Sequence, residues 1–199
     1  MGSFIMNQET AIKSQIEESI RLNKYLATKV DILMSIADEL IEGFRTGNKV
    51  LLFGNGGSAA DAQHITSELA GKFSRDREAL PAIALTTNTS SLTAIANDYG
   101  YETVFVRQLQ GLVKKGDVVI GISTSGNSSN VLLAIEEAKR RGAVTIAFTG
   151  KGGKLRELVD YVLSIPSEDT PRIQEAHITA GHIICYLVEE ALFGGGRGG

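Results

Sequence analysis

Five short apolar runs punctuate the chain, and each is followed by a turn of glycine or polar residues. The runs are 49–53 (KVLLF), 81–86 (PAIALT), 118–123 (VVIGIS), 144–149 (VTIAFT) and 161–165 (YVLSI). Most of the turns lead into a stretch in which apolar residues recur at helical spacing. Uninterrupted apolar strands that alternate with helices are typical of a parallel sheet covered on both faces. The pattern therefore predicts an α/β fold, with a five-stranded parallel sheet sandwiched by helices.

A long helical region, roughly 8–45, precedes the first predicted strand. Its apolar residues recur near helical spacing and comprise Ile12, Ile16, Ile20, Leu22, Val30, Leu33, Ile36, Leu40 and Ile41. This is more helix than one sheet needs for cover, so we expect part of it to pack between subunits. No repeat or linker divides the chain, so residues 1–199 are predicted to form a single domain. The glycine-rich tail, 193–199, is expected to be disordered.

Composition and charge exclude several classes of protein. The net charge is −3 and no run of Lys or Arg is present, which argues against a nucleic-acid partner. No apolar run approaches the length of a membrane span, and no basic segment followed by an apolar one marks a secretory signal. The single cysteine, Cys185, excludes an internal disulfide. Binding to nucleic acid or to a membrane is therefore not expected.

The turn after the first predicted strand belongs to the stretch FGNGGSAADAQHITSE, residues 53–68. Gly54, Gly56 and Ala59 fit the permissive dinucleotide pattern G-x-G-x-x-G/A. However, the second strand ends in ALTTNTSS, without the carboxylate that would bind a ribose hydroxyl. Glycines also let backbone N–H groups converge on a phosphate or sugar, and Ser58 can cap the helix that follows. This second interpretation is favoured over the dinucleotide site.

The turn after the third predicted strand, ISTSGNSSNV, is rich in hydroxyl groups. It places Ser123, Thr124, Ser125, Ser128 and Ser129 around Gly126 and Asn127, just before a predicted helix at 129–141. Hydroxyls and free N–H groups at a helix N-terminus suit a phosphate monoester. The Gly-Lys-Ser/Thr ending of a P-loop is missing, so a nucleoside triphosphate is disfavoured. The alternative is a serine-rich loop with one cap, although capping does not require five hydroxyls.

Candidates for chemistry lie on two predicted helices. His64 and Glu68 are four residues apart and share one helical face near the first glycine turn. Such a pair can share a metal, or one group can orient the other for proton transfer, although spacing by itself favours a surface pair. Gln174 and His182 lie on one face of a predicted C-terminal helix, 169–193, about 12 Å apart along its axis. His177 points elsewhere and is expected to be a structural residue.

Four segments together resemble the phosphoheptose (sedoheptulose 7-phosphate) isomerases, which belong to the sugar isomerase (SIS) domain family. These segments are GNGGSAADAQH…E, AIANDYGY, ISTSGNSSNVL and RIQEAHITAGH. The resemblance covers nearly the whole chain, from the N-terminal helices to the last one. The first and third segments are shared by several SIS proteins, whereas the combination of His64, Glu68, Gln174 and His182 is much more specific.

The resemblance implies a role for each matching residue. Substrate would be contacted by Asn55, Gly56, Gly57, Ser58, Asn97 and Asp98, with Glu68 and Gln174. Its phosphate would be held by Ser123, Thr124, Ser125 and Ser128. One Zn²⁺ per subunit would be coordinated by His64, Glu68, Gln174 and His182, although ligand type leaves nickel or manganese open. Glu68 and His182 would be the catalytic pair that moves protons.

The resemblance also implies an activity and a setting. The family isomerises sedoheptulose 7-phosphate to D-glycero-D-manno-heptose 7-phosphate through an enediol, the first step toward nucleotide-activated heptose and lipopolysaccharide. Its members are cytoplasmic homotetramers. Three alternatives are a non-catalytic SIS protein that binds the replication initiator DnaA, an isomerase of another ketose phosphate, and a muramic acid phosphate etherase. His182 favours an enzyme over the DnaA-binding relatives, which lack this histidine, and the full set of four ligands is not expected in the etherases or arabinose 5-phosphate isomerases.

Overall fold

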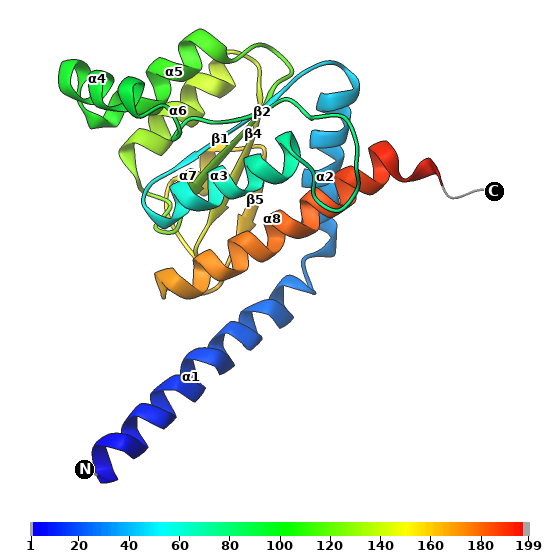
Figure 1. The fold of residues 1–199 in the computed structure, drawn as a ribbon. Helices are drawn as coiled ribbons and strands as arrows, with labels where there is room; N and C mark the ends of the chain where they lie inside the picture. The colour runs from blue at the N-terminus through cyan, green and yellow to red at the C-terminus, as the bar shows by residue number, and fades with distance from the viewer. Residues whose placement is uncertain (1, 197–199) are drawn as a thin grey trace.

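A five-stranded sheet forms the centre of the molecule in the computed structural model, which describes residues 2–196 (Figure 1). The strands are β1 Val50–Gly54, β2 Ala82–Ala84, β3 Val118–Ser123, β4 Val144–Thr149 and β5 Tyr161–Ser164. They pair in the order β2-β1-β3-β4-β5, and every pairing is parallel. All five predicted strands are confirmed, although β2 keeps only three of the six residues expected for it.

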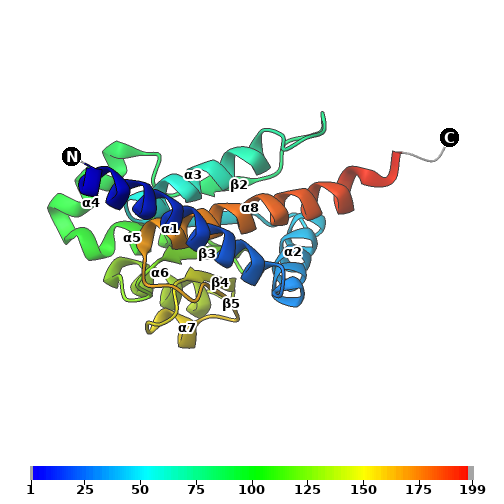
Figure 2. The same ribbon diagram turned by 90° about the horizontal axis from the view of Figure 1, so that it is seen from below.

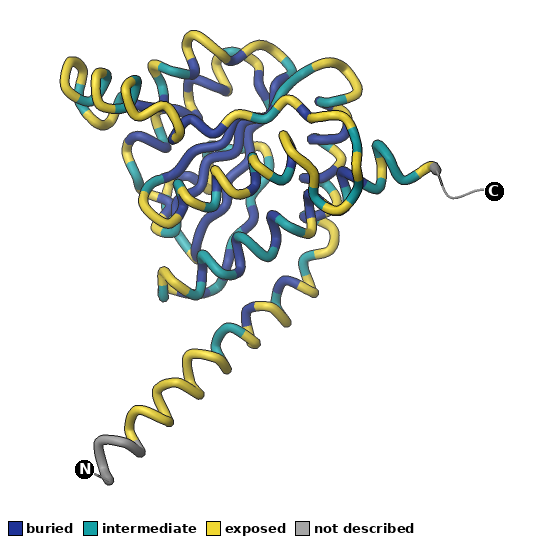
Figure 3. Tube along the Cα trace, in the orientation of Figure 1, coloured by how far each residue is buried: buried dark blue, intermediate teal, exposed yellow. Residues whose placement is uncertain are grey.

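Both faces of the sheet are buried, as the uninterrupted apolar runs predict. Side chains along β1 alternate, so that Leu52 joins the hydrophobic core on one face and Leu51 and Phe53 join the core on the other. β3 repeats the alternation with Ile120 and Val119. Figure 3 shows the result as a dark blue sheet between helices whose outer turns are exposed. The sandwich of helices around a parallel sheet is therefore confirmed.

Helices cover the sheet from two sides. The α-helices are α1 Gly2–Leu26, α2 Val30–Arg45, α3 Gly57–Ala70, α4 Thr89–Tyr99, α5 Val104–Leu112, α6 Ser129–Arg140, α7 Leu155–Leu158 and α8 Thr170–Phe193. Buried residues of α1, α2, α3 and α8 share one core with the sheet, and those of α5, α6 and α7 share the other. The helix predicted at 129–141 and the one predicted at 169–193 are thus confirmed, the latter beginning with Pro171 in its first turn.

The strand order creates a crevice at the carboxyl edge of the sheet. From β1 the chain goes outward to β2, whereas from β3 it goes the other way to β4 and β5. Ligands of open α/β sheets bind at such a switch point, beyond the carboxyl ends of the two strands that flank it. These strands are β1 and β3, and the two turns selected from the sequence follow them directly.

The N-terminal helical region consists of two helices, because residues 27–29 between α1 and α2 are not helical. α1 projects from the body in Figure 1 and crosses α8 in the view of Figure 2, where its second half packs against that helix. Ile12, Ile16 and Ile20 are 61%, 55% and 49% exposed. Among the described residues, no helix combines the length and the apolar character that crossing a membrane requires.

The first residues of the tail that is predicted to be disordered, 193–199, continue the last helix in the structure. Phe193 ends α8, and Gly194–Gly196 form a 3-10 turn. The N–H of Gly194 donates to the carbonyl oxygen of Glu190, so the turn continues the hydrogen bonding of the helix. Residues 197–199 of that prediction lie outside the described residues.

Candidate active site at the carboxyl edge of the sheet

The turn after β1 is held by amide hydrogen bonds. The side-chain amides of Asn55 and Asn130 donate to each other's oxygens, both at 2.9 Å, and the Tyr101 hydroxyl donates to Asn55 Oδ1 at 3.0 Å. Gly56 has a φ of +54°, a backbone conformation that a side chain disfavours, and it leads directly into α3. Ser58 is buried in the first turn of that helix but makes no side-chain cap.

Gly57 brings the C-terminal helix to the same turn. A Cβ atom at this position would lie 2.3 Å from Gln174 Nε2, so the absence of a side chain is what lets Gln174 of α8 lie against the start of α3. Two residues predicted to touch substrate, from segments more than 100 positions apart, are thereby neighbours.

The loop after β3 gathers its hydroxyl groups at one point. Ser123 Oγ lies 3.0 Å from Ser128 Oγ and 3.5 Å from Ser125 Oγ. Gly126, with a φ of +65°, packs so closely that an added Cβ would lie 2.5 Å from the Gly152 carbonyl oxygen. Thr124 and Ser125 line a surface cavity that α8 and the turn after β4 complete, with Asn127, Lys151, Gly152, Gly153, Ser167, Glu168 and Thr170. These hydroxyls and the free N–H groups of α6 suit a phosphate group.

A cluster of potential metal ligands lies farther along α3. His64 Nε2 is 3.2 Å from Glu68 Oε1, and His182 Nε2 of α8 is 3.0 Å from His64 Nε2. One ligand atom from each of the three residues lies within 4.8 Å of the others. The sequence placed these residues on two helices, and the packing of α3 against α8 makes them one site.

The spacing of these atoms fits a zinc ion. Nitrogen and oxygen ligands bound at 2.0–2.2 Å in a tetrahedron are about 3.3–3.5 Å apart. In the structure, His64 Nε2 lies 3.0 Å from His182 Nε2 and 3.2 Å from Glu68 Oε1, close to that value. Two imidazole nitrogens and a carboxylate oxygen are ligand types that zinc commonly binds in proteins. The donor set therefore fits the metal that the sequence predicts.

Gln174 is not part of this cluster in the structure. Its amide lies against Gly57, two helical turns before His64 on α3. Eight residues separate Gln174 from His182, which is about 12 Å along an ideal helix. As a fourth ligand, Gln174 stays a prediction that requires its side chain to turn toward the cluster.

Asn97 and Asp98 lie at the end of α4 and are exposed. The Asn97 amide donates to Asp98 Oδ1 at 2.8 Å. α4 is well separated from α8 in Figure 1. The connection of this segment to the site runs through Tyr101, whose hydroxyl reaches Asn55. The role of Asn97 and Asp98 in substrate binding therefore stays a prediction.

His177 is a core residue, as its separate helical face predicts. It is fully buried, its ring lies 5.7 Å from that of Phe148, and its Nε2 is 3.2 Å from the Thr149 carbonyl oxygen. Burial lowers the pKa of His177 to about 4, despite the opposing effect of its hydrogen bond to the Thr149 carbonyl oxygen. The imidazole is therefore neutral at pH 7 and holds the end of β4.

Asp61 is a polar residue of this region that sequence reasoning missed. It stands one turn before His64 on α3, and its Oδ2 is buried without a hydrogen-bond partner among the described residues. Burial raises the pKa of Asp61 to about 6, against the opposing effect of His64. Its i, i+3 spacing from His64 was visible in the sequence, but its burial was not. Asn130, Tyr101 and Lys151 were also missed, because only the fold brings them to the two turns.

Comparison with known proteins identifies the family to which the chain belongs. The SIS domain model matches residues 16–150. The phosphoheptose isomerase of Aneurinibacillus thermoaerophilus is 54% identical over 186 residues, which cover 92% of this chain and 94% of that protein. The chain belongs to the phosphoheptose isomerase family.

Solved structures of the phosphoheptose isomerase family share the fold described above. The phosphoheptose isomerase of Neisseria gonorrhoeae superposes with a TM-score of 0.87 at 40% identity, covering 92% of this chain and 99% of that one. The Francisella tularensis phosphoheptose isomerase gives a TM-score of 0.89 at 36% identity, covering 92% and 98%. The resemblance predicted from the four sequence segments is confirmed.

Proposed function

We propose that this protein is an aldose–ketose isomerase that converts sedoheptulose 7-phosphate to D-glycero-D-manno-heptose 7-phosphate. The observation that carries the proposal is the convergence of His64, Glu68 and His182 from two helices whose N-terminal ends lie at the turns suited to a sugar and a phosphate. The names of the relatives at 54% identity agree with this substrate class. The reaction would begin the synthesis of nucleotide-activated heptose, such as that used in lipopolysaccharide.

The isomerisation moves one proton between neighbouring carbons and another between their oxygens. The Glu68 carboxylate would take the proton from C1 of the ketose, and His182 would give a proton to the oxygen on C2, which leaves an enediol. Glu68 would then return its proton to C2, and His182 would take the proton from the oxygen on C1. No net proton is gained or lost, and both side chains return to their starting state.

His64, Glu68, His182 and, after a side-chain rotation, Gln174 would hold one Zn²⁺ per subunit. When bound, the ion would supply Lewis-acid stabilisation of the negative charge that develops on the sugar oxygens. His64 has no other role in this proposal. Its ring lies 4.9 Å from that of His182, so the two imidazoles orient each other.

The substrate would span the crevice from the metal cluster to the loop 123–128. Ser123, Thr124, Ser125 and Ser128 would hold the phosphate. Lys151 lines the same cavity and is paired with Glu168 at 2.7 Å. Asn55, Gly56, Gly57 and Ser58 would contact the sugar from the turn after β1. Asn97 and Asp98 would reach the substrate from α4.

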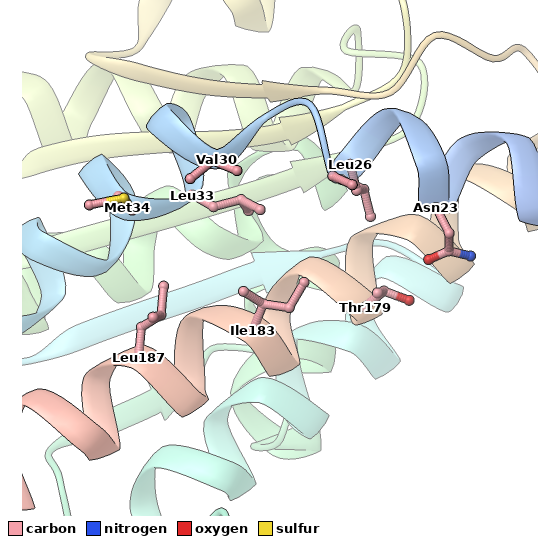
Figure 4. Close-up of a pocket in the computed structure, with 9 residues that line it drawn as sticks. Asn23, Leu26, Val30, Leu33, Met34, Thr179, Ile183 and Leu187 are labelled. Atoms are coloured by element: carbon pink, nitrogen blue, oxygen red, sulfur yellow. The ribbon is translucent and has the colours of Figure 1, made fainter. Parts of the chain in front are cut away.

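The proposal includes a cytoplasmic homotetramer of single-domain subunits. Its support is an unpaired apolar surface on the helices. A groove of about 370 Å³ between the α1–α2 junction and α8 is lined by Asn23, Leu26, Ala27, Val30, Leu33, Met34, Thr179, Ile183 and Leu187 (Figure 4). Replacing Ile16 by lysine, with Glu17→Gln as the exposed neighbour control, should reduce the mass measured by light scattering. A monomeric parent protein would contradict the assembly.

The decisive experiment is an isomerisation assay with sedoheptulose 7-phosphate, in which the aldose product is followed by NMR. We expect turnover that a chelator abolishes and added Zn²⁺ restores. Fructose 6-phosphate and ribulose 5-phosphate serve as competing ketoses. Turnover of one of these, but not of sedoheptulose 7-phosphate, would overturn the assigned substrate. Unchanged turnover after the metal is removed would overturn the metal's role.

A further inference from the structure

A buried carboxylate on α8 accepts several hydrogen bonds from the loop that follows α3. Glu189 is 1% exposed, yet its two oxygens accept hydrogen bonds from the N–H groups of Phe73, Ser74 and Arg75 at 2.8–3.1 Å. The Ser74 hydroxyl and Arg77 Nε donate to the same carboxylate at 2.7 and 3.0 Å. Burial opposes ionisation, but these donors outweigh it and lower the pKa of Glu189 to about 2. The side chain is therefore ionised and fully bonded.

The Arg77 guanidinium extends this contact to the end of α3. Its side chain is 2% exposed. Nη2 donates to the Glu68 carbonyl oxygen at 2.8 Å, and Nη1 donates to the carbonyl oxygens of Leu69 and Gly71 at 2.9 and 3.1 Å. A cation at these carbonyls also complements the negative end of the helix dipole. Arg77 thus holds the main chain of Glu68 itself.

The two helices joined in this way are the two that carry the metal cluster. α3 and α8 lie side by side in both Figure 1 and Figure 2. His182 lies seven residues, or two turns, before Glu189 on α8. Its ring lies 5.9 Å from that of Phe73, in the loop that Glu189 binds. The pair therefore contacts both sides of the cluster. Arg77 binds the main chain at Glu68, and Glu189 binds the main chain of Phe73, whose ring lies beside His182.

We propose that the buried Arg77–Glu189 pair is a positioning device that sets the distance and rotation of Glu68 relative to His182. The inference rests on the proposed function, since it assigns the pair a task in metal binding and proton transfer. Residues that orient metal ligands typically change metal affinity or activity 10–100-fold when they are replaced. The planar fork of arginine makes bonds in fixed directions that a lysine ammonium does not reproduce.

The test compares Arg77→Lys and Glu189→Gln with the parent protein. We expect Zn²⁺ affinity, measured by competition with a chromophoric chelator, to fall about 10–100-fold. In the isomerase assay, kcat should fall by a similar factor while KM changes less than about 3-fold, because the phosphate and sugar turns are untouched. Arg77→Lys should lose less than Arg77→Met, since it keeps the charge at the end of α3.

Asp117→Asn is the matched control, because it breaks a second buried pair far from the site. Asp117 is 1% exposed and accepts hydrogen bonds from Lys49 Nζ and from the N–H groups of Lys49 and Lys114. The Asp117→Asn substitution should lower Tm without changing Zn²⁺ affinity or kcat. The proposal is overturned if Arg77→Lys and Glu189→Gln behave like this control. If Glu189→Gln does not fold, Arg77→Lys and Arg77→Met decide by the same measurements.

The proposed isomerase function and the proposed role of the Arg77–Glu189 pair can be refuted separately. A parent protein that binds Zn²⁺ but does not isomerise sedoheptulose 7-phosphate would refute the proposed function, while the Zn²⁺ affinities of the variants would still test the pair. An active parent with unchanged variants would refute the pair and leave the function intact.

Discussion

The two edges of the sheet use polar groups in opposite ways. At the amino edge, Asp117 is buried and receives three hydrogen bonds, two from Lys49 and one from Lys114. At the carboxyl edge, the hydroxyls of Ser123, Ser125 and Ser128 gather at one point of the loop after β3. A hydroxyl group has one donor and two acceptor positions, so the clustered serines keep hydrogen-bonding capacity for a ligand. This difference agrees with the proposal that the carboxyl edge binds a ligand, whereas the amino edge contributes to stability.

This comparison predicts that substitutions will separate activity from stability. A change in the loop 123–128 or in the metal cluster should remove function and leave the free energy of unfolding almost unchanged. A change at the amino edge should do the reverse. Four predictions test this separation, and they are given from the largest expected effect to the smallest.

Glu68→Gln should lower kcat by about 10²–10⁴-fold, because it keeps an oxygen for the metal and removes the base. Tm should stay close to that of the parent, since the Glu68 side chain is partly exposed. Steady-state kinetics and calorimetry measure both quantities, and His182→Asn should behave in the same way. Turnover near the parent rate in Glu68→Gln would refute the mechanism even if the family assignment stands.

Asp117→Asn should destabilise the fold by about 3 kcal/mol or more, because it leaves Lys49 without its buried partner. Urea unfolding gives the free energy, and the isomerase assay at 25 °C should give a parent-like kcat. A loss of activity without a loss of stability would reverse the proposed roles of the two edges.

The contribution of His177 to stability should fall as the pH drops from about 6.5 to about 4, whereas the raised pKa of Asp61 contributes with the opposite sign. Unfolded His177 takes up a proton in this interval, whereas buried His177 has a pKa of about 4 and does not. The unfolded state therefore binds more protons, and the loss amounts to about 3 kcal/mol from a shift of about 2.5 units.

His177→Asn should reduce this slope in urea unfolding measured at pH 7, 5.5 and 4.5. The variant is expected to be less stable than the parent at pH 7, because the smaller side chain leaves a void beside Phe148. An equal slope in both proteins would mean that His177 is not the group that titrates.

Replacing Ser123, Ser125 and Ser128 together by alanine should weaken binding of sedoheptulose 7-phosphate by about 10²-fold. Hydrogen bonds to a charged group contribute about 1.5–3 kcal/mol each, and the backbone N–H groups remain. Titration calorimetry measures the affinity, and Tm should change little because the loop contributes little to the core. Ser67→Ala, in an exposed turn of α3, is a control that should bind like the parent. Unchanged affinity in the triple variant would show that these hydroxyls do not bind the phosphate.

The sequence determined the elements and their kind. Apolar runs of four to six residues separated by helices specify parallel strands, because such runs are stable only when both faces are covered. The glycines of the first turn and the hydroxyls of the loop 123–128 could be proposed as ligand-binding groups from the sequence, since their chemistry is local. The motifs around His64 and His182 were sufficient to recognise the family.

The tertiary structure decided which residues meet. His64 and His182 are 118 positions apart, and only the packing of α3 on α8 brings their nitrogens to 3.0 Å. The same packing placed Gln174 on Gly57, away from the cluster, and buried Arg77 against Glu189, which no local pattern indicated. Periodicity reports the face on which a side chain lies, but the rotation and separation of two helices depend on contacts between distant segments. For this reason the ligand set could be predicted by type, whereas its geometry and its supports could not.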